Sequence, residues 1–136
     1  MLKNAQLGKE IVITVANKIG ILADVSKILA EHGINIEAVA GYAEKDGNAK
    51  IMLVTADNLR ASDALIKAGY KSAKENEIVI LGLENKAGAL KMISGILAAE
   101  GVDIKYIYGT ACSGECPARM VLSTTDNEKA LVAFKK

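Results

Sequence analysis

Two short loops in the sequence combine an amide side chain, a lysine and a glycine at the same spacing. Residues 17–20 read Asn-Lys-Ile-Gly, and residues 85–88 read Asn-Lys-Ala-Gly. Each loop follows an apolar run typical of a strand and precedes an amphipathic stretch typical of a helix. The first N–H groups of a helix have no partner within it, and the helix dipole favours negative charge at that end. Each loop is therefore a candidate binding site for a carboxylate.

The residue types around each loop extend this chemistry from an anion to an amino acid. Gly20 and Gly88 allow a ligand to approach the backbone, and the asparagine amides offer donors and an acceptor. Asn35 and Asp103 open the next predicted strands, and an ionised Asp103 can accept a hydrogen bond from an ammonium group. A carboxylate site, an amide and an acidic acceptor together complement a zwitterionic amino acid.

The alternative is that these residues serve only turn and capping roles, which glycine and asparagine fill in many proteins. The functional interpretation gains weight because the constellation occurs twice, while other positions have diverged, as Asp24 has from Met92. That comparison is internal to the chain.

The sequence contains an internal repeat that includes both loops. A shift of 88 − 20 = 68 residues places Ser26 on Ser94 and Gly33 on Gly101, without an insertion between residues 17 and 54. The 136 residues therefore predict two units of about 65 residues each. We assign residues 1–76 to the first and 77–136 to the second.

The first copy predicts an α+β unit with the order strand, helix, strand, strand, helix, strand. A polar turn with Asp46-Gly47 predicts a hairpin between the second and third strands. An antiparallel sheet with both helices on one face is the ferredoxin-like arrangement. The expected elements are a strand at 10–16, a helix from 20, strands at 35–42 and 49–55, a helix at 57–68, and a weak strand at 70–74.

The second copy predicts the same order, but it ends before a fourth strand. Residues 126–134 read as its last helix, and Lys136 falls on Ala68 of the first copy. Two ferredoxin-like units packed together are expected, the second without its fourth strand. Its sheet edge is then either open or covered, by residues 1–8 or by a partner chain.

Composition excludes several classes of function. The net charge is +1, so no basic surface for nucleic acid or an anionic membrane is expected. The longest apolar runs are too short to span a bilayer, and residues 1–9 lack a signal-peptide core. We expect a cytoplasmic protein with aliphatic cores and no cofactor.

Three residues with reactive or metal-binding side chains remain to be placed. Cys112 and Cys116 flank the predicted second hairpin turn, as a thiol pair, incidental turn residues or half of a metal site. Tetrahedral zinc needs further ligands, and His32, the one histidine, lies in the other copy. We expect no metal site, and a surface or capping role for His32.

Three tyrosines lie on predicted strands. Tyr106 and Tyr108 share one strand face, and Tyr42 occupies nearly the equivalent place in the first copy. They either pack in the core or an interface, which is the favoured reading, or form one wall of a ligand pocket.

Three other functions of this fold are not supported by the residue pattern. RNA binding needs aromatic residues on the central strands, and 10–16 and 50–54 contain none. A metallochaperone needs paired cysteines in the first turn. An enzyme needs a convergent acid, base or nucleophile, and no such set is found.

Both copies resemble ACT domains, small regulatory modules that bind amino acids. The family's pattern of a hydrophobic strand, an Asn-x-x-Gly turn, a helix and Gly-Val/Ile-Asn-Ile is met by residues 11–15, 17–20 and 33–36. It is met again by 85–88 and 101–104, where Asp103 replaces the asparagine. Ile19 and Ala87 stand where the family often has proline. The resemblance covers nearly the whole chain.

The resemblance implies a non-enzymatic module that binds a free amino acid at an interface between ACT units, in a homodimer, and regulates an enzyme in trans. A structural or interaction scaffold with degenerate sites is the alternative. The implied ligand-binding residues come from the two turns and the starts of the following strands: Asn17, Lys18, Ile19, Gly20, Ile21, Leu22, Asn35, Ile36, Asn85, Lys86, Ala87, Gly88, Ala89, Leu90, Asp103 and Ile104.

Overall fold

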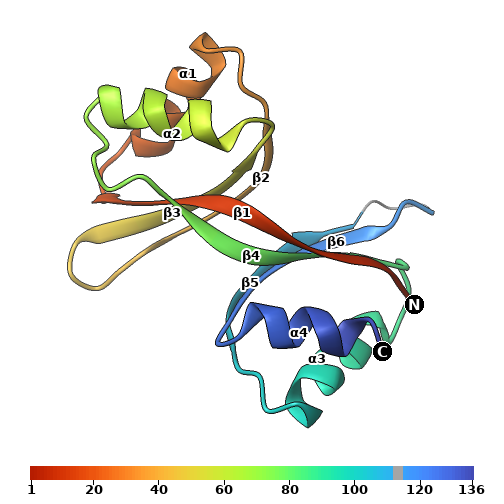
Figure 1. The fold of residues 1–136 in the computed structure, drawn as a ribbon. Coiled ribbons are helices and arrows are strands. Elements are labelled where there is room, and N and C mark those ends of the chain that lie inside the picture. The colour runs from red at the N-terminus through yellow and green to blue at the C-terminus, as the bar shows by residue number, and fades with distance from the viewer. Residues whose placement is uncertain (112–114) are drawn as a thin grey trace. The chain divides into compact units, whose positions relative to one another are not determined.

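A computed structural model describes residues 1–111 and 115–136 (Figure 1). None of the helices in these two ranges is long and apolar enough to cross a membrane. The elements follow the predicted order: β1 (Leu2–Ala16), α1 (Ile21–Glu31), β2 (Ile36–Ala43), β3 (Asn48–Thr55), α2 (Asn58–Lys67), β4 (Lys74–Leu83), α3 (Ala89–Ala99), β5 (Ile104–Thr110), β6 (Ala118–Thr124) and α4 (Asn127–Phe134).

The chain forms two compact units. The first unit is Lys9–Asn76, and the second unit combines Met1–Gly8 with Glu77–Lys136. This division differs from the predicted 1–76 and 77–136 in the placement of residues 1–8. Strands β1 and β4 each contribute one part to each unit, because both cross the division.

The first unit is the predicted ferredoxin-like βαββαβ fold. Its strands lie in the order β2-β3-β1-β4, with β1 and β2 both antiparallel to β3. Helices α1 and α2 lie together on one side of this sheet (Figure 1). They bury aliphatic side chains against β1 and β3, and the buried members of this core include Ile11, Ile13, Val25, Leu29, Leu53 and Leu65.

The weak strand predicted at 70–74 is wrong for its first four residues. Residues 70–73 form a turn in which the amide of Ala73 donates to the carbonyl of Tyr70, at 3.2 Å. The strand begins at Lys74 and continues to Leu83 as β4. One long strand thus serves as the fourth strand of the first copy and the first strand of the second.

The second unit lacks a fourth strand of its own, as predicted, because residues after β6 form helix α4. Its sheet order is β1-β4-β6-β5, so the first part of β1 lies beside β4. The amide of Glu84 donates to the carbonyl of Met1, at 2.7 Å. Of the two predicted alternatives, the edge covered by residues 1–8 is therefore confirmed.

Both second helices begin at the same type of cap. The carboxylate of Asp57 accepts from the amide of Arg60, and that of Asp126 accepts from the amide of Lys129. An aspartate at this position satisfies one of the unpaired N–H groups of the first helical turn. The two aspartates are 126 − 57 = 69 residues apart, and Met120 pairs with Gly109 where Ile51 pairs with Gly41. The repeat therefore continues into the second helix with one extra residue between 110 and 118, and the predicted alignment without an insertion as far as residue 54 is wrong.

Candidate ligand-binding site

The first predicted turn joins β1 to α1 through residues 17–20. Gly20 is the residue before the helix, and its φ of 89° lies in the left-handed region, which a residue with a Cβ adopts only under strain. It offers no side chain to cap the helix. A Cβ built on Gly20 meets nothing within 4 Å, so the backbone at this corner is open.

The first turn of α1 leaves two backbone donors unused. The amide of Ile21 donates to the Lys18 carbonyl at 3.3 Å, and that of Asp24 donates to the Gly20 carbonyl at 3.0 Å. Among the residues that the structure describes, the amides of Leu22 and Ala23 have no acceptor. An uncapped helix start of this kind favours a negatively charged group.

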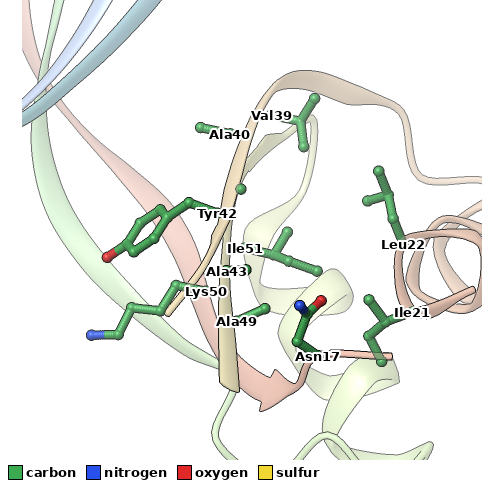
Figure 2. A pocket seen from close by; sticks show the side chains of 11 residues that line it. Asn17, Ile21, Leu22, Val39, Ala40, Tyr42, Ala43, Ala49, Lys50 and Ile51 are labelled. Carbon is green, nitrogen blue, oxygen red and sulfur yellow. The ribbon is translucent and has the colours of Figure 1, made fainter. Parts of the chain in front are cut away.

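A cleft of about 370 Å³ opens beside this turn (Figure 2). Its walls come from the turn and the start of α1, from the end of β2, and from the start of β3. The lining residues are Asn17, Ile21, Leu22, Val39, Ala40, Gly41, Tyr42, Ala43, Ala49, Lys50 and Ile51. A mostly apolar cleft with a few polar groups is typical of a small-molecule site.

Asn17 is held by its backbone, and its side chain is left available. Its amide N–H donates to the carbonyl of Gly47 in the β2–β3 turn, at 2.9 Å. The side-chain amide of Asn17 has no hydrogen-bond partner in residues 1–111 or 115–136. Figure 2 shows that amide near Ile21 and Ile51, while Tyr42 and Lys50 extend on the other side of β2. Asn17 is thus the polar group available on the aliphatic side of the cleft.

The second predicted turn has the same backbone geometry. Gly88 precedes α3 with a φ of 89°, and the amide of Met92 donates to its carbonyl at 3.0 Å. The surroundings differ, because a Cβ built on Gly88 would lie 3.5 Å from Cε of Met1. The corner at Gly88 is therefore partly covered by the chain itself, and the corner at Gly20 is not.

Charges also surround the second turn differently. The Glu84 carboxylate lies 3.0 Å from the amino group of Met1 and 3.2 Å from Nζ of Lys86. Hydrogen bonds from these two groups lower the pKa of Glu84. The residue equivalent to Glu84 in the first copy is Ala16, since 84 − 68 = 16. The lysine of the first turn consequently lacks the carboxylate partner that Lys86 has.

Comparison with known proteins identifies the family of the domain that contains the first turn. Residues 9–67 match the ACT domain family. These residues form an ACT domain. No curated protein sequence matches it.

Solved structures resemble the chain over nearly its full length. Protein BT0572 from Bacteroides thetaiotaomicron is 29% identical with a TM-score of 0.87, covering 96% of this chain and 88% of that one. The regulatory subunit of aspartate kinase from Thermus thermophilus, in its ligand-free form, is 16% identical with a TM-score of 0.66, covering 98% and 96%. The corresponding subunit from Thermus flavus is 18% identical with a TM-score of 0.63, over the same shares of the two chains. At these lower identities the likeness is one of fold.

Within the first ACT unit, the predicted residues at the start of the second strand lie away from the cleft. Ile36 pairs with Thr55 at one end of β2, whereas Ala43 pairs with Ala49 at the other. The turn at Asn17 lies at the second end, because Ala16 pairs with Asn48. The two ends of β2 are separated by roughly 24 Å along the strand. Asn35 and Ile36 therefore do not line this cleft.

The other predicted residues of the first turn are divided between environments. Ile21 and Leu22 line the cleft, Ile19 is fully exposed, and Lys18 lies in a different, smaller cleft. Sequence reasoning missed the end of β2, residues 39–43, apart from proposing Tyr42 as one alternative wall. The structure places Tyr42 in the lining.

In the second unit, Ala89 is buried at the start of α3, and Asn85, Lys86, Ala87, Gly88 and Leu90 are exposed. Asp103 is fixed by its backbone: its amide donates to Oγ1 of Thr125 at 3.1 Å, and its carbonyl accepts from the Thr125 amide at 3.0 Å. Ile104 pairs with Thr124. The register of β5 thus places both residues at the strand end remote from the second turn.

The remaining predicted residues have simple environments. Nδ1 of His32 shares a hydrogen bond of 2.8 Å with the carbonyl of Ile28, at the end of α1, as expected for a capping residue. The rings of Tyr106 and Tyr108 stack with centroids 6.4 Å apart.

Of the two cysteines, Cys112 lies outside the described residues. Across the described ranges, no group of three metal-binding side chains occurs.

A hydrogen bond ties the start of α1 to the turn before β4 and gives a test of the geometry. The Tyr70 hydroxyl donates to Oδ2 of Asp24, and this bond, with burial and the charge of Asp24, raises the pKa of Tyr70 to about 12. The bond therefore contributes stability below pH 10, the ordinary pKa of tyrosine, and that contribution is lost as the pH rises through about 12. We expect the Tyr70 ring carbon to titrate near 12 by NMR, and near its ordinary value in Asp24→Asn. An unchanged midpoint in that variant would disprove the assignment.

Proposed function

We propose that this protein is a regulatory module that binds a free amino acid at the first ACT turn. The observation that carries the proposal is the open corner at Gly20, with two unused helix amides beside it and an unpartnered Asn17 amide in the adjoining cleft. The helix start would receive the carboxylate, and Asn17 would bond to a polar group of the ligand. The aliphatic walls suit a small apolar side chain.

The two turns are proposed to be unequal. Both have the same backbone, but Met1 partly covers Gly88, and Glu84 brings a carboxylate close to the second turn. Glu84 also pairs with Nζ of Lys86 and so competes with a ligand carboxylate for that lysine, whereas Ala16 exerts no such effect on Lys18 in the first turn. The first turn is accordingly the stronger site of the two.

A second copy of the chain is proposed to complete the site. Strand β2 is an edge strand of the first unit's sheet, and its residues Val39 and Tyr42 are half exposed. Antiparallel pairing of two β2 strands would place Ile36 of one copy opposite Ala43 of the other. Asn35 and Ile36 of each copy would then lie near the other copy's cleft. They could contribute to ligand binding there, although they lie far from the cleft of their own unit.

Regulation would follow from a difference in ligand affinity between two arrangements of the protein. A ligand shifts such an equilibrium only by the ratio of its affinities for the two states, commonly worth about 1–3 kcal/mol. The regulatory subunits of aspartate kinase from the two Thermus species have the same fold. This likeness supports an enzyme acted on in trans as the recipient of the signal.

The proposal is tested by thermal unfolding in the presence of each of the twenty amino acids. At a concentration of about 100 times Kd, a true ligand adds about 2.7 kcal/mol to the free energy of unfolding. We expect Asn17→Ala to weaken the affinity about tenfold, as loss of one hydrogen bond to a ligand commonly does. Asn85→Ala, the same substitution in the second turn, is expected to change it less than threefold.

Sedimentation velocity on the same samples tests the shared site, since the ligand should favour the dimer. An absence of any shift with all twenty amino acids would contradict the proposal and favour the scaffold alternative. Equal losses in the two variants would contradict the inequality of the turns.

A further inference from the structure

The first unit contains a second cleft on the other side of the same turn. It encloses about 250 Å³ between the end of β1, residue Lys18 of the turn, and the loop that precedes β4. Lys71 and Ser72 come from that loop, and Thr14 from β1. Ile21 lines both this cleft and the larger one, so the two share a wall.

Two positive charges in this cleft are not neutralised. Neither Lys18 nor Lys71 forms an ion pair with any residue that the structure describes, and the lining contains no carboxylate. The equivalent lysine of the second copy is neutralised, because Nζ of Lys86 lies 3.2 Å from the Glu84 carboxylate. Ala16 replaces that carboxylate in the first copy and also lines the cleft.

The loop that carries Lys71 is fixed against β1. Oγ of Ser72 accepts from the amide of Thr14 at 2.9 Å and donates to the Thr14 carbonyl at 2.8 Å. These two bonds hold Lys71 beside the strand end from which Lys18 follows. The hydroxyl of Thr14 has no partner in the described part of the chain, so a third donor is available.

One carboxylate is bonded to a residue of this cleft. Asp24, in the first turn of α1, accepts a hydrogen bond from the hydroxyl of Tyr70, and Tyr70 is one of the residues that line the cleft. The hydroxyl is neutral throughout the physiological range. The cleft thus presents two ammonium groups and one available hydroxyl, that of Thr14, with one carboxylate nearby that already accepts a hydrogen bond.

We propose that this cleft binds the phosphate group of a small phosphorylated metabolite, as a site separate from the amino-acid site. Lysine ammonium groups bind phosphate as point charges, and two of them match a phosphate group, which carries a charge of about −1.5 to −2 at pH 7, better than a carboxylate with a single charge. The volume admits a phosphate with a few attached atoms. The shared Ile21 places this site against the wall of the amino-acid cleft.

The test is an amide NMR titration with inorganic phosphate at constant ionic strength, using chloride as the balancing anion. We expect saturable shifts at residues 14–21 and 69–72. Lys18→Gln and Lys71→Gln should each weaken the affinity about tenfold, since each removes one of two charges close to the anion. Lys86→Gln, the same substitution in the second turn, should leave the affinity unchanged.

Further arms separate this proposal from its alternatives. Acetate should bind at least tenfold more weakly than phosphate, and equal binding would overturn the assignment to phosphate. Shifts that do not saturate, or that weaken equally in Lys86→Gln, would overturn the site. Asn17→Ala should leave phosphate binding unchanged, because Asn17 lines only the larger cleft. Failure here is therefore distinguishable from failure of the amino-acid site.

Discussion

Replacing Leu65 by alanine is expected to lower the free energy of unfolding of the first unit by about 2–5 kcal/mol. Leu65 lies on α2 with none of its surface exposed, and it belongs to the core formed with Ile11, Leu29 and Leu53. The substitution removes the transfer free energy of the buried carbon atoms and leaves a cavity that the aliphatic neighbours fill only partly. A unit of this size has little stability in reserve.

Leu59→Ala is the matched control for this prediction. Leu59 lies on the same helix, but 74% of its surface is exposed, so its truncation should change the free energy of unfolding by no more than about 0.5 kcal/mol. The measurement is urea denaturation followed by circular dichroism, with hydrogen exchange of the α2 and β1 amides to assign the change to the first unit. Similar losses for the two variants would show that Leu65 is not a buried core residue of the folded protein.

The repeated turns illustrate what local sequence can predict. Each loop of the form Asn-Lys-x-Gly folds to a glycine with a φ of 89° followed by a helix, because the apolar period, the glycine and the uncapped start are all encoded within a few residues. The hairpin at Asp46-Gly47 is equally local, and residues 36–43 and 48–55 form its strands within one residue of the prediction.

The composition of the cleft could not be predicted in the same way. Which end of β2 meets Asn17 depends on the pairing of β1 and β2 with β3, and that register is a property of three strands together. The family resemblance placed Asn35 beside the turn, and the local pattern around Asn35 shows only that it opens the next strand. Reasoning from the antiparallel register would have placed residues 39–43 there instead.

The covering of the second unit's edge was also beyond local reasoning. Residues 1–8 alternate weakly and contain few β-branched side chains, so nothing in them distinguishes an edge strand from an exposed arm. Their pairing with β4 covers an edge along which the second unit has no further strand of its own, within the residues that the structure describes.

The two copies also differ at one glycine pair, and the difference predicts effects of different size from the same substitution. Gly41 and Gly109 are equivalent, since 109 − 68 = 41, and neither has a positive φ. A Cβ on Gly109 would collide with the carbonyl oxygen of Arg119 and with Sδ of Met120. A Cβ on Gly41 would lie 3.4 Å from its nearest atom, the carbonyl oxygen of Lys50, which is ordinary contact.

Gly109→Ala is therefore expected to lower the free energy of unfolding by about 1–3 kcal/mol, because the methionine side chain can move but the β6 backbone must shift to relieve the second clash. Gly41→Ala is expected to change it by less than about 1 kcal/mol, with the gain from a less flexible unfolded chain offsetting slight crowding. Urea denaturation gives both values, and hydrogen exchange should place the Gly109→Ala effect at the β5 and β6 amides. Equal losses in the two variants would mean that the close approach of β5 to β6 at Gly109 is not a feature of the folded protein.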